Sequence, residues 1–172
     1  MKALVLLLTL LCGTALYCGH NSKKLHIGDK APDFALLNQD GEIMQRDDFR
    51  GQRVALYFYP KDSTPGCSQQ ACSLRDDFDL LADNNIVILG LSKGSVKSKQ
   101  KFIKKKHLPF TLLIATEKTL KDYGVNTGFF RFYLPKRWTF LIDEDGFIVD
   151  IIKSVDTKHH AEQILNAFNA IK

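Results

Sequence analysis

The amino-acid sequence predicts an α/β fold in which helices flank a central mixed β-sheet, preceded by an N-terminal β-hairpin. Two near-continuous apolar runs, residues 53–60 (RVALYFYP) and 86–92 (IVILGLS), have the pattern of buried central strands. Residues 67–82, between them, place apolar side chains at three- and four-residue steps, as an amphipathic helix does. Turn sequences at 39–41 (QDG) and 144–146 (EDG) mark two hairpins.

The remaining segments complete a regular order of elements. After the first hairpin (residues 33–49), strands and helices alternate, and the chain closes with an antiparallel pair and a last helix. This β-α-β-α-β-β-α order, with parallel strands joined by helices, indicates a thioredoxin-like sheet. The elements not yet named are a basic helix at 96–107, a short strand at 110–114, a short helix at 120–123, strands at 137–143 and 147–152, and a terminal helix at 157–171.

Length and composition fit one globular domain without a nucleic-acid partner. The chain has 172 residues, of which 45% are hydrophobic and 25% charged, and these values are ordinary for a folded domain. The formal net charge of +5 is mild, and the basic residues are densest in 97–106 (KSKQKFIKKK). We expect this run to be the solvated face of a helix, because no nucleic-acid-binding motif accompanies it.

The first residues have the pattern of a secretory signal peptide. Residues 1–16 (MKALVLLLTLLCGTAL) place one lysine before an apolar run that ends in small residues, and the run is short for a membrane span. We expect residues 1–18 to be a leader and residues 25–172 to form the domain, so that the protein is exported to a periplasm, an endomembrane lumen or the cell exterior. Lipid attachment at Cys18 is the alternative, but Tyr17 stands where a lipoprotein signal prefers a small residue.

The cysteines point to redox chemistry rather than to a structural staple. Of four cysteines, Cys12 and Cys18 lie in or beside the leader, so the domain keeps the pair Cys67 and Cys72. A disulfide-stapled secreted scaffold would need more cysteines. Positions five apart in an intact helix have Cα atoms roughly 8–9 Å apart, whereas a disulfide needs less than about 7 Å. The pair can bond only where the helix unwinds, as a pair that closes and reopens during turnover would.

Cys67 stands at the predicted start of a helix. The unpaired backbone N–H groups and the positive end of the helix dipole favour a thiolate over a thiol there, and the thiolate is the nucleophile. Pro65 and Gly66 shape the turn before it, and Thr64 offers a hydroxyl three residues before the sulfur. The position therefore suits an activated cysteine.

Metal binding is the other interpretation of the cysteine pair. Zinc sites usually combine shorter gaps with a second ligand pair, and a copper site would add a histidine to the thiolates. His159 and His160 start a predicted surface helix and His107 ends the basic helix, so we expect all three to face solvent. No histidine is adjacent to Cys67 in sequence, which also argues against a Cys–His hydrolase. We predict neither a metal nor a cofactor.

Residues 59–72 (YPKDSTPGCSQQAC) resemble the active-site segment of the peroxiredoxins, specifically the bacterioferritin comigratory protein or Q-type subgroup. The family pattern Pro-x-x-x-Thr-x-x-Cys falls on Pro60, Thr64 and Cys67. The segments HLPFTLL, DYGV and RWTFLIDEDGFIV are also similar to this subgroup, so the resemblance runs from about Gly28 to the C-terminus. It implies a thioredoxin-like fold and a thiol peroxidase that reduces hydrogen peroxide and organic hydroperoxides.

The resemblance also implies a role for each matching residue. Cys67 would be the peroxidatic cysteine, which attacks the peroxide and becomes a sulfenic acid. Thr64 would hydrogen-bond the thiolate and the peroxide, Pro60 would shield the pocket, and Arg137 would stabilise the thiolate and the developing charge. Cys72 would be the resolving cysteine, forming an intramolecular disulfide that a thioredoxin-like protein would reduce. We expect a monomer.

The sequence departs from the subgroup at several positions. Gln70 stands where Glu is frequent, Trp138 where a small residue is common, and Ala115-Thr116 where an acidic residue is expected. These changes bear on substrate preference and rate rather than on reaction class. Residues 129–138 (FFRFYLPKRW) are rich in aromatics. They form either a loop packed on the core or an apolar collar near the reactive cysteine, which would favour organic hydroperoxides or dock a partner.

A second function stays open at this point: an exported thioredoxin-fold protein without peroxidase activity, either a copper-binding assembly factor or a thiol–disulfide exchange partner. Such proteins usually carry Cys-x-x-Cys or Cys-x-x-x-Cys. The four-residue gap between Cys67 and Cys72, together with Thr64, favours the peroxidase.

Overall fold

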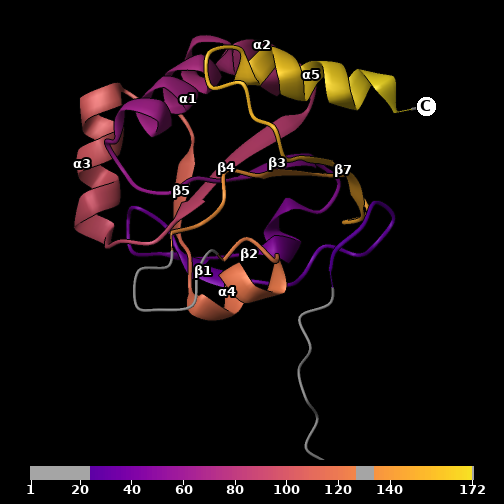
Figure 1. Ribbon diagram of the computed structural model, residues 1–172, viewed down its shortest axis with the longest axis horizontal. Coiled ribbons are helices and arrows are strands. Elements are labelled where there is room, and N and C mark those ends of the chain that lie inside the picture. The colour runs from indigo at the N-terminus through magenta and orange to yellow at the C-terminus, as the bar shows by residue number, and fades with distance from the viewer. Residues whose placement is uncertain (1–23, 127–133, 172) are drawn as a thin grey trace, which may run out of the picture.

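The computed structural model describes residues 24–126 and 134–171 and has the mixed α/β architecture that the sequence predicts. Helices lie on both faces of one central sheet, and a small hairpin sheet lies to one side of it (Figure 1). The predicted leader, residues 1–18, lies outside the described residues. Within the part of the chain that the structure describes, no helix is both long enough and apolar enough to cross a membrane.

Five strands form the central sheet. They are β3 (Arg53–Phe58), β4 (Ile86–Ser92), β5 (Thr111–Ile114), β6 (Thr139–Ile142) and β7 (Ile148–Ile152). Their order in the sheet is β5-β4-β3-β6-β7, so β3 is central. β3 pairs in parallel with β4, and β4 with β5, while β6 runs antiparallel to both β3 and β7. The predicted mixed sheet is therefore confirmed, including the antiparallel pair that closes it.

The predicted N-terminal hairpin is also present, as a separate two-stranded sheet of β1 (Ala35–Leu37) and β2 (Ile43–Gln45). Asn38 organises its turn, because its Oδ1 accepts hydrogen bonds from the backbone N–H groups of Asp40 (2.8 Å) and Glu42 (2.9 Å). The short 3₁₀ helix η1 (Arg46–Phe49) then leads the chain towards β3.

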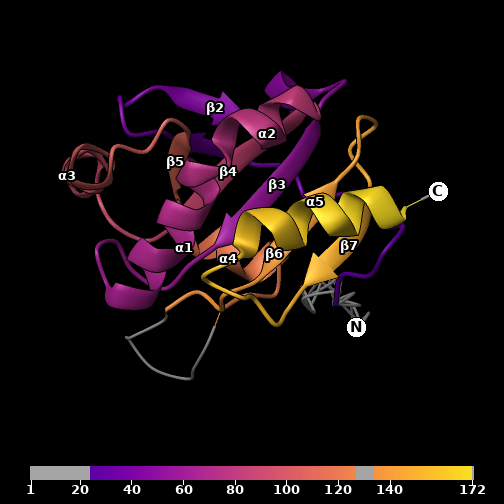
Figure 2. The same ribbon diagram turned by 90° about the horizontal axis from the view of Figure 1, so that it is seen from above.

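The helices form two layers around the sheet. They are α1 (Pro65–Asp76), α2 (Phe78–Asp83), α3 (Val96–Lys106), α4 (Glu117–Asp122) and α5 (His160–Ala170). α1, α2 and α5 cover one face of the sheet, whereas α4 and the hairpin lie on the opposite side (Figure 1). Viewed from above, the start of α5 lies beside α1, and α3 stands at the β5 edge (Figure 2).

The single helix predicted at 67–82 is wrong, because the chain forms two helices that separate at Asp77. Asp77 has φ −110° and ψ 21°, outside the helical range, and aspartate is a poor residue for a helix interior. Leu74, Phe78 and Leu81 nevertheless pack in one cluster. The apolar spacing continues through the break, and spacing alone therefore predicts one helix.

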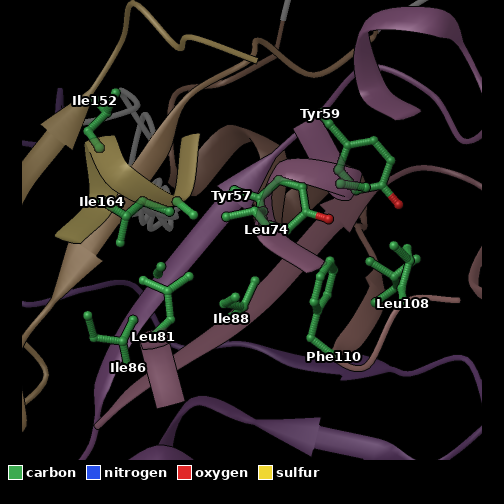
Figure 3. Close-up of a cluster of buried hydrophobic side chains, with 14 of the residues drawn as sticks. Tyr57, Tyr59, Leu74, Leu81, Ile86, Ile88, Leu108, Phe110, Ile152 and Ile164 are labelled. Carbon is green, nitrogen blue, oxygen red and sulfur yellow. The ribbon is translucent and has the colours of Figure 1, made fainter. Parts of the chain in front are cut away.

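Two apolar clusters, one on each face of the sheet, make the core. β3 contributes to both, since alternate side chains point to opposite faces: Ala55 and Tyr57 join the first cluster, and Leu56 and Phe58 the second. The first cluster lies between the sheet and α1, α2 and α5 (Figure 3). Cys67 belongs to this cluster, so the fold places the sulfur against the sheet rather than on the surface.

The aromatic segment 129–138 is only partly described, because residues 129–133 lie outside the described residues. Trp138 packs against the second cluster, which is on the other face of the sheet from Cys67. The departure at Trp138 therefore affects the face opposite the reactive cysteine.

Candidate active site

Cys67 lies in the first turn of α1, where the chain has just left the central strand. α1 begins at Pro65 with Thr64 as its N-cap residue, so the predicted helix start beside the cysteine is confirmed. The Cys67 side chain is only 1% exposed. Burial would disfavour a thiolate, whereas the free N–H groups and dipole of the helix start favour it. A cation near a sulfur also favours the thiolate.

Arg137 is that cation. Its Nη2 lies 3.3 Å from the Cys67 Sγ, within hydrogen-bonding distance for sulfur. The sheet brings the two together: Tyr57 of β3 pairs with Thr139 of β6, and the backbone N–H of Phe58 donates to the Trp138 carbonyl (2.8 Å). A guanidinium next to the sulfur stabilises its ionised form. The predicted proximity of Arg137 and Cys67 is therefore observed.

Arg137 also belongs to a buried polar chain that runs away from the sulfur. Its Nη1 donates to Gln70 Oε1. Gln70 Nε2 lies 3.0 Å from His160 Nδ1, and His160 Nε2 lies 3.0 Å from the Thr139 hydroxyl oxygen. Gln70, His160 and Thr139 are all fully buried. The expectation that His160 faces solvent is therefore wrong, whereas His159 and His107 are exposed as predicted.

The order of donors fixes the state of the His160 ring. Because Gln70 Oε1 accepts from Arg137, its Nε2 must donate to His160 Nδ1, and the ring proton lies on Nε2 and points to Thr139. Burial lowers the pKa of His160 to about 3, and the positive charge of Arg137 adds to this effect. The imidazole is thus neutral at pH 7, and the positive charge of this chain stays on Arg137.

This buried chain of hydrogen bonds explains the effect of having glutamine rather than glutamate at position 70. A glutamate, which the subgroup often has there, could only accept hydrogen bonds when ionised. Its carboxylate would lie next to the Arg137 guanidinium, and it would require the His160 ring proton to be on Nδ1. With Gln70, the guanidinium is hydrogen-bonded by a neutral amide, and no carboxylate at this position competes with the Cys67 sulfur for its charge.

Thr64 and Pro60 lie in the loop between β3 and α1, and both are half-buried. The Thr64 hydroxyl donates to the Lys61 carbonyl at 3.0 Å, which tightens the loop immediately before the helix. A hydroxyl oxygen retains acceptor capacity when it donates one hydrogen bond. The Thr64 hydroxyl can therefore donate to the loop carbonyl and still accept a hydrogen bond from a ligand.

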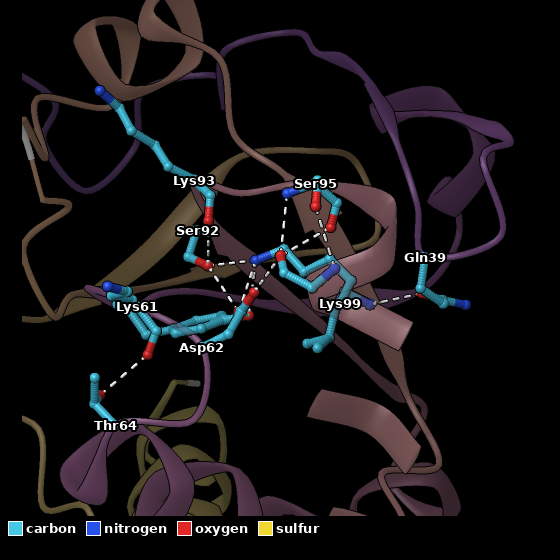
Figure 4. A network of polar contacts seen from close by, with 11 residues as sticks. Gln39, Lys61, Asp62, Thr64, Ser92, Lys93, Ser95 and Lys99 are labelled. Carbon is cyan, nitrogen blue, oxygen red and sulfur yellow. Dashed lines mark hydrogen bonds and ion pairs between the residues drawn. The ribbon is translucent and has the colours of Figure 1, made fainter. Parts of the chain in front are cut away.

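A second polar cluster, around Asp62, holds the same loop from behind (Figure 4). Asp62 accepts hydrogen bonds from Lys99 Nζ (2.9 Å), the Tyr59 hydroxyl (2.7 Å) and the Ser98 hydroxyl (2.8 Å). Lys99 is fully buried on α3, so the expectation that the basic run 97–106 is entirely solvated is wrong at this residue. We call Asp62, Lys99, Tyr59 and Ser98 the loop anchor.

The charges of the loop anchor stabilise each other. Burial lowers the pKa of Lys99, and the negative charge of Asp62 partly offsets that effect. Burial alone would raise the pKa of Asp62, but Lys99 and the hydrogen bonds outweigh it and leave the pKa below its usual value. Lys99 Nζ and Asp62 Oδ1 lie 2.9 Å apart, and this ion pair fixes the loop against α3.

Cys72 lies further along α1 and is half-buried, with a free thiol like that of Cys67. Both cysteines are inside one continuous helix, Pro65–Asp76. The helical spacing that forbids a direct disulfide therefore applies in this form of the protein.

Sequence reasoning missed the buried residues Ser73, Lys99, Thr139 and His160, and for Lys99 and His160 the helical pattern contains a signal. Lys99 stands three residues before Phe102, the buried apolar residue of α3. His160 stands four residues before Ile164, on the buried face of α5. A polar residue in register with an apolar stripe is expected to point inwards and to need a partner.

Comparisons with known proteins show the family of the chain. The model of the AhpC/TSA family matches residues 27–151, which is most of the chain. The chain belongs to the AhpC/TSA family. Peroxiredoxin Bcp of Escherichia coli is 40% identical over 149 residues, covering 83% of this chain and 94% of the relative.

Solved structures of AhpC/TSA relatives share the fold. Peroxidoxin BcpB of Mycobacterium tuberculosis has a TM-score of 0.78 and 31% identity, covering 85% of this chain and 97% of its own. The bacterioferritin comigratory protein of Xanthomonas campestris, described for its alkyl peroxide reduction activity, has a TM-score of 0.74 and 27% identity, with 80% and 90% of the two chains covered. The predicted thioredoxin-like fold and the resemblance to this subgroup are therefore confirmed.

Membership of the AhpC/TSA family also decides between the two functions. The curated relatives are peroxiredoxins, so the chain is a thiol peroxidase rather than a copper-binding assembly factor or a thiol–disulfide exchange partner. Among residues 24–126 and 134–171, no group of three or more His, Cys, Asp or Glu side chains is placed to hold a metal ion.

Proposed function

We propose that this peroxidase uses Cys67 as its peroxidatic cysteine and Cys72 as its resolving cysteine. The observation that supports this most directly is the 3.3 Å contact between Arg137 Nη2 and the buried Cys67 Sγ at a helix start. An ionised sulfur with a guanidinium beside it is a nucleophile with a ready stabiliser for developing negative charge.

The proposed reaction begins with the Cys67 thiolate attacking the terminal oxygen of a hydroperoxide. An S–O bond forms, the O–O bond breaks, and the alcohol or water leaves with a proton, so that Cys67 becomes a sulfenic acid. The Thr64 hydroxyl and the Arg137 guanidinium bind the reacting oxygens, and Pro60 shields them from water. Arg137 acts here as an electrostatic stabiliser, because its charge is already in place before the peroxide arrives.

The second step forms the disulfide. The Cys72 sulfur attacks the sulfenic acid, an S–S bond forms and water leaves. Because both cysteines lie in one helix, the first turns of α1 unwind before the sulfurs meet. Unwinding also exposes Cys67, and a thioredoxin-like dithiol then reduces the bond by exchange and is itself oxidised.

Hydrogen peroxide and organic hydroperoxides are the proposed substrates. Cys67 belongs to the same apolar cluster as Tyr57, Tyr59 and Leu74, which supports binding of an organic group near the sulfur. A relative at 27% identity is described for alkyl peroxide reduction, which supports the organic substrates. Comparison of hydrogen peroxide with an alkyl hydroperoxide at equal concentration measures the preference.

Substitution of each cysteine tests the assignment. Cys67→Ser should abolish peroxide consumption, because serine is not ionised at neutral pH. Cys72→Ser should keep the first turnover, one peroxide per chain, and then stop at the sulfenic acid or its over-oxidised forms. Consumption of peroxide with a thioredoxin system and mass spectrometry of the 67–72 bond measure both results. Full activity of Cys67→Ser would reject the assignment.

We also propose that the protein is exported and works as a monomer. The supporting observation for export is the leader pattern in residues 1–18, and it predicts a mature chain that starts close to residue 18. N-terminal sequencing of protein recovered from the producing cells tests it. An N-terminus at Met1 in a cytosolic fraction would reject export, and recovery in the membrane fraction with lipid on Cys18 would favour the anchored form.

A further inference from the structure

The C-terminal helix is fastened to the catalytic helix at one point. The backbone N–H groups of His160 and Ala161 both donate to the Ser73 hydroxyl oxygen, at 2.9 and 3.3 Å. The His160 ring lies 3.0 Å from Gln70 Nε2. Gln70, Ser73 and His160 are all buried. We call these three residues the α5 latch; Figure 2 shows the start of α5 beside α1.

The latch replaces a cap that α5 lacks. The N-cap residue of α5, His159, makes no side-chain hydrogen bond to the helix start. Free N–H groups at a buried helix start are costly, and Ser73 of α1 satisfies two of them. Any movement that carries Ser73 away would leave those groups without a protein acceptor.

The latch also reaches the reacting sulfur. Gln70 holds His160 with its Nε2 and Arg137 with its Oε1, and Arg137 contacts Cys67. An amide side chain can rotate unless both ends are held. His160 therefore fixes the plane of Gln70, and the plane of Gln70 fixes the direction of the guanidinium.

The two α1 residues of the latch flank Cys72. Gln70 lies between the two cysteines, and Ser73 directly follows the second one. Unwinding of α1 between Cys67 and Cys72 moves Gln70 out of reach of His160. The same contacts that orient Arg137 therefore oppose the change of shape that a 67–72 disulfide requires.

We propose that His160 is a positioning residue of the peroxidase reaction, which holds Gln70 and Arg137 against Cys67 while α1 is folded and releases α1 when the disulfide forms. This inference rests on the proposed roles of Cys67 and Cys72. It gives His160 opposite effects on the two steps: the contact accelerates attack on the peroxide and slows formation of the disulfide.

Two substitutions at His160 separate its two ring nitrogens. Asparagine places a polar atom near the position of Nδ1 and keeps the partner of Gln70, whereas glutamine places one near Nε2 and keeps only the partner of Thr139. His160→Gln should therefore lose the link to Gln70 and His160→Asn should retain it. His159→Gln changes the exposed neighbouring histidine in the same way and serves as the matched control.

The two steps are measured separately. In chains that also carry Cys72→Ser, trapping of the sulfenic acid gives the rate of attack on hydrogen peroxide. In chains with Cys72, rapid quenching and mass spectrometry give the rate of disulfide formation. We expect His160→Gln to slow the first step about tenfold and to accelerate the second several-fold. His160→Asn should recover at least half of the first-step rate, and His159→Gln should change neither step.

Specific outcomes would overturn the inference. A slower second step in His160→Gln, or equal first-step losses in His160→Gln and His160→Asn, would mean that His160 only supports the fold. Hydrogen exchange of the α1 amides is a measurement that does not depend on the peroxide reaction. Unchanged exchange rates in His160→Gln would show that the α5 latch does not hold α1. A parent chain whose Cys67 does not react with peroxide would instead reject the proposed function, and the positioning role with it.

Discussion

At the scale of single residues, the guanidinium of Arg137 is the group whose shape matters most. One Nη atom donates to Gln70 and the other contacts the Cys67 sulfur, so a planar fork serves two partners at once. A lysine ammonium carries the same charge but has no fixed fork, and it cannot hold both partners with the same geometry.

Arg137→Lys therefore separates charge from geometry. We expect the rate of Cys67 oxidation by hydrogen peroxide to fall at least about tenfold, which corresponds to about 1.4 kcal/mol of transition-state stabilisation. Stopped-flow measurement under excess peroxide gives the rate. Arg53→Lys is a matched control, because Arg53 forms a surface pair with Glu144 (3.1 Å) at the opposite end of β3. A rate in Arg137→Lys equal to that of the control would show that charge alone suffices.

His160 makes the stability of the protein depend on acid. Its pKa falls from 6.5 to about 3 on folding, chiefly through burial, so between these values the unfolded chain binds a proton that the folded chain does not. The contribution of His160 is thus fully present above pH 6.5 and is lost as the pH falls towards 3. The expected slope is up to about 1.4 kcal/mol per pH unit in this window.

Urea unfolding of the reduced protein at pH 7, 5.5 and 4 measures this slope. His160→Asn lacks the titrating ring, so its free energy of unfolding should fall less steeply over the same window. Parallel pH profiles for the parent and for His160→Asn would contradict the assignment of this acid sensitivity to His160.

At the scale of the elements, the loop between β3 and α1 is held by a buried ion pair on α3. Lys99 is fully buried and Asp62 is 10% exposed. Removing one partner of such a pair leaves an uncompensated charge, which typically costs about 3–5 kcal/mol. The anchor is therefore expected to affect both stability and the placement of Cys67, which follows the loop.

Lys99→Met tests the loop anchor. We expect the free energy of unfolding to fall by about 3 kcal/mol, and peroxide reactivity to fall because the loop loses its fixed position. The double variant with Asp62→Asn should regain part of the stability, since the unpaired charge is gone. Lys101→Met, an exposed residue of the same helix, is the control and should change stability by less than about 0.5 kcal/mol. Equal losses at both lysines would contradict the anchor.

The elements also show how far sequence reasoning reaches. The continuous apolar runs predicted β3 and β4, the turn residues predicted both hairpins, and the motif before Cys67 predicted the start of α1. Periodicity did not reveal the break at Asp77, because apolar spacing continues through it. Lys99 and His160 are polar side chains, which are usually exposed, yet both are buried in register with the apolar stripes of their helices. Their partners, Asp62 and Gln70, lie far away in sequence, and only tertiary packing brings them close.

At the scale of the whole molecule, only one of the two faces of the sheet carries the candidate active site. The face with α1, α2 and α5 holds Cys67, the latch and the first apolar cluster. The opposite face holds the hairpin, α4 and the second apolar cluster, which packs against the same strands and does not include Cys67. A change of shape in α1 can therefore be confined to one layer.

Oxidation should make this division visible. When the 67–72 disulfide forms, α1 unwinds and the start of α5 loses Ser73, so amide hydrogen exchange should rise in 65–76 and at residues 160–162. Exchange in β1, β2 and α4 should stay within error, because these elements pack on the opposite face (Figure 1). The measurement compares reduced protein with protein treated with one equivalent of peroxide. Cys72→Ser is the control, since its sulfenic acid leaves the helix intact. Increased exchange on both faces would mean that the disulfide loosens the whole domain, and unchanged exchange in α1 would mean that the sulfurs meet without unwinding.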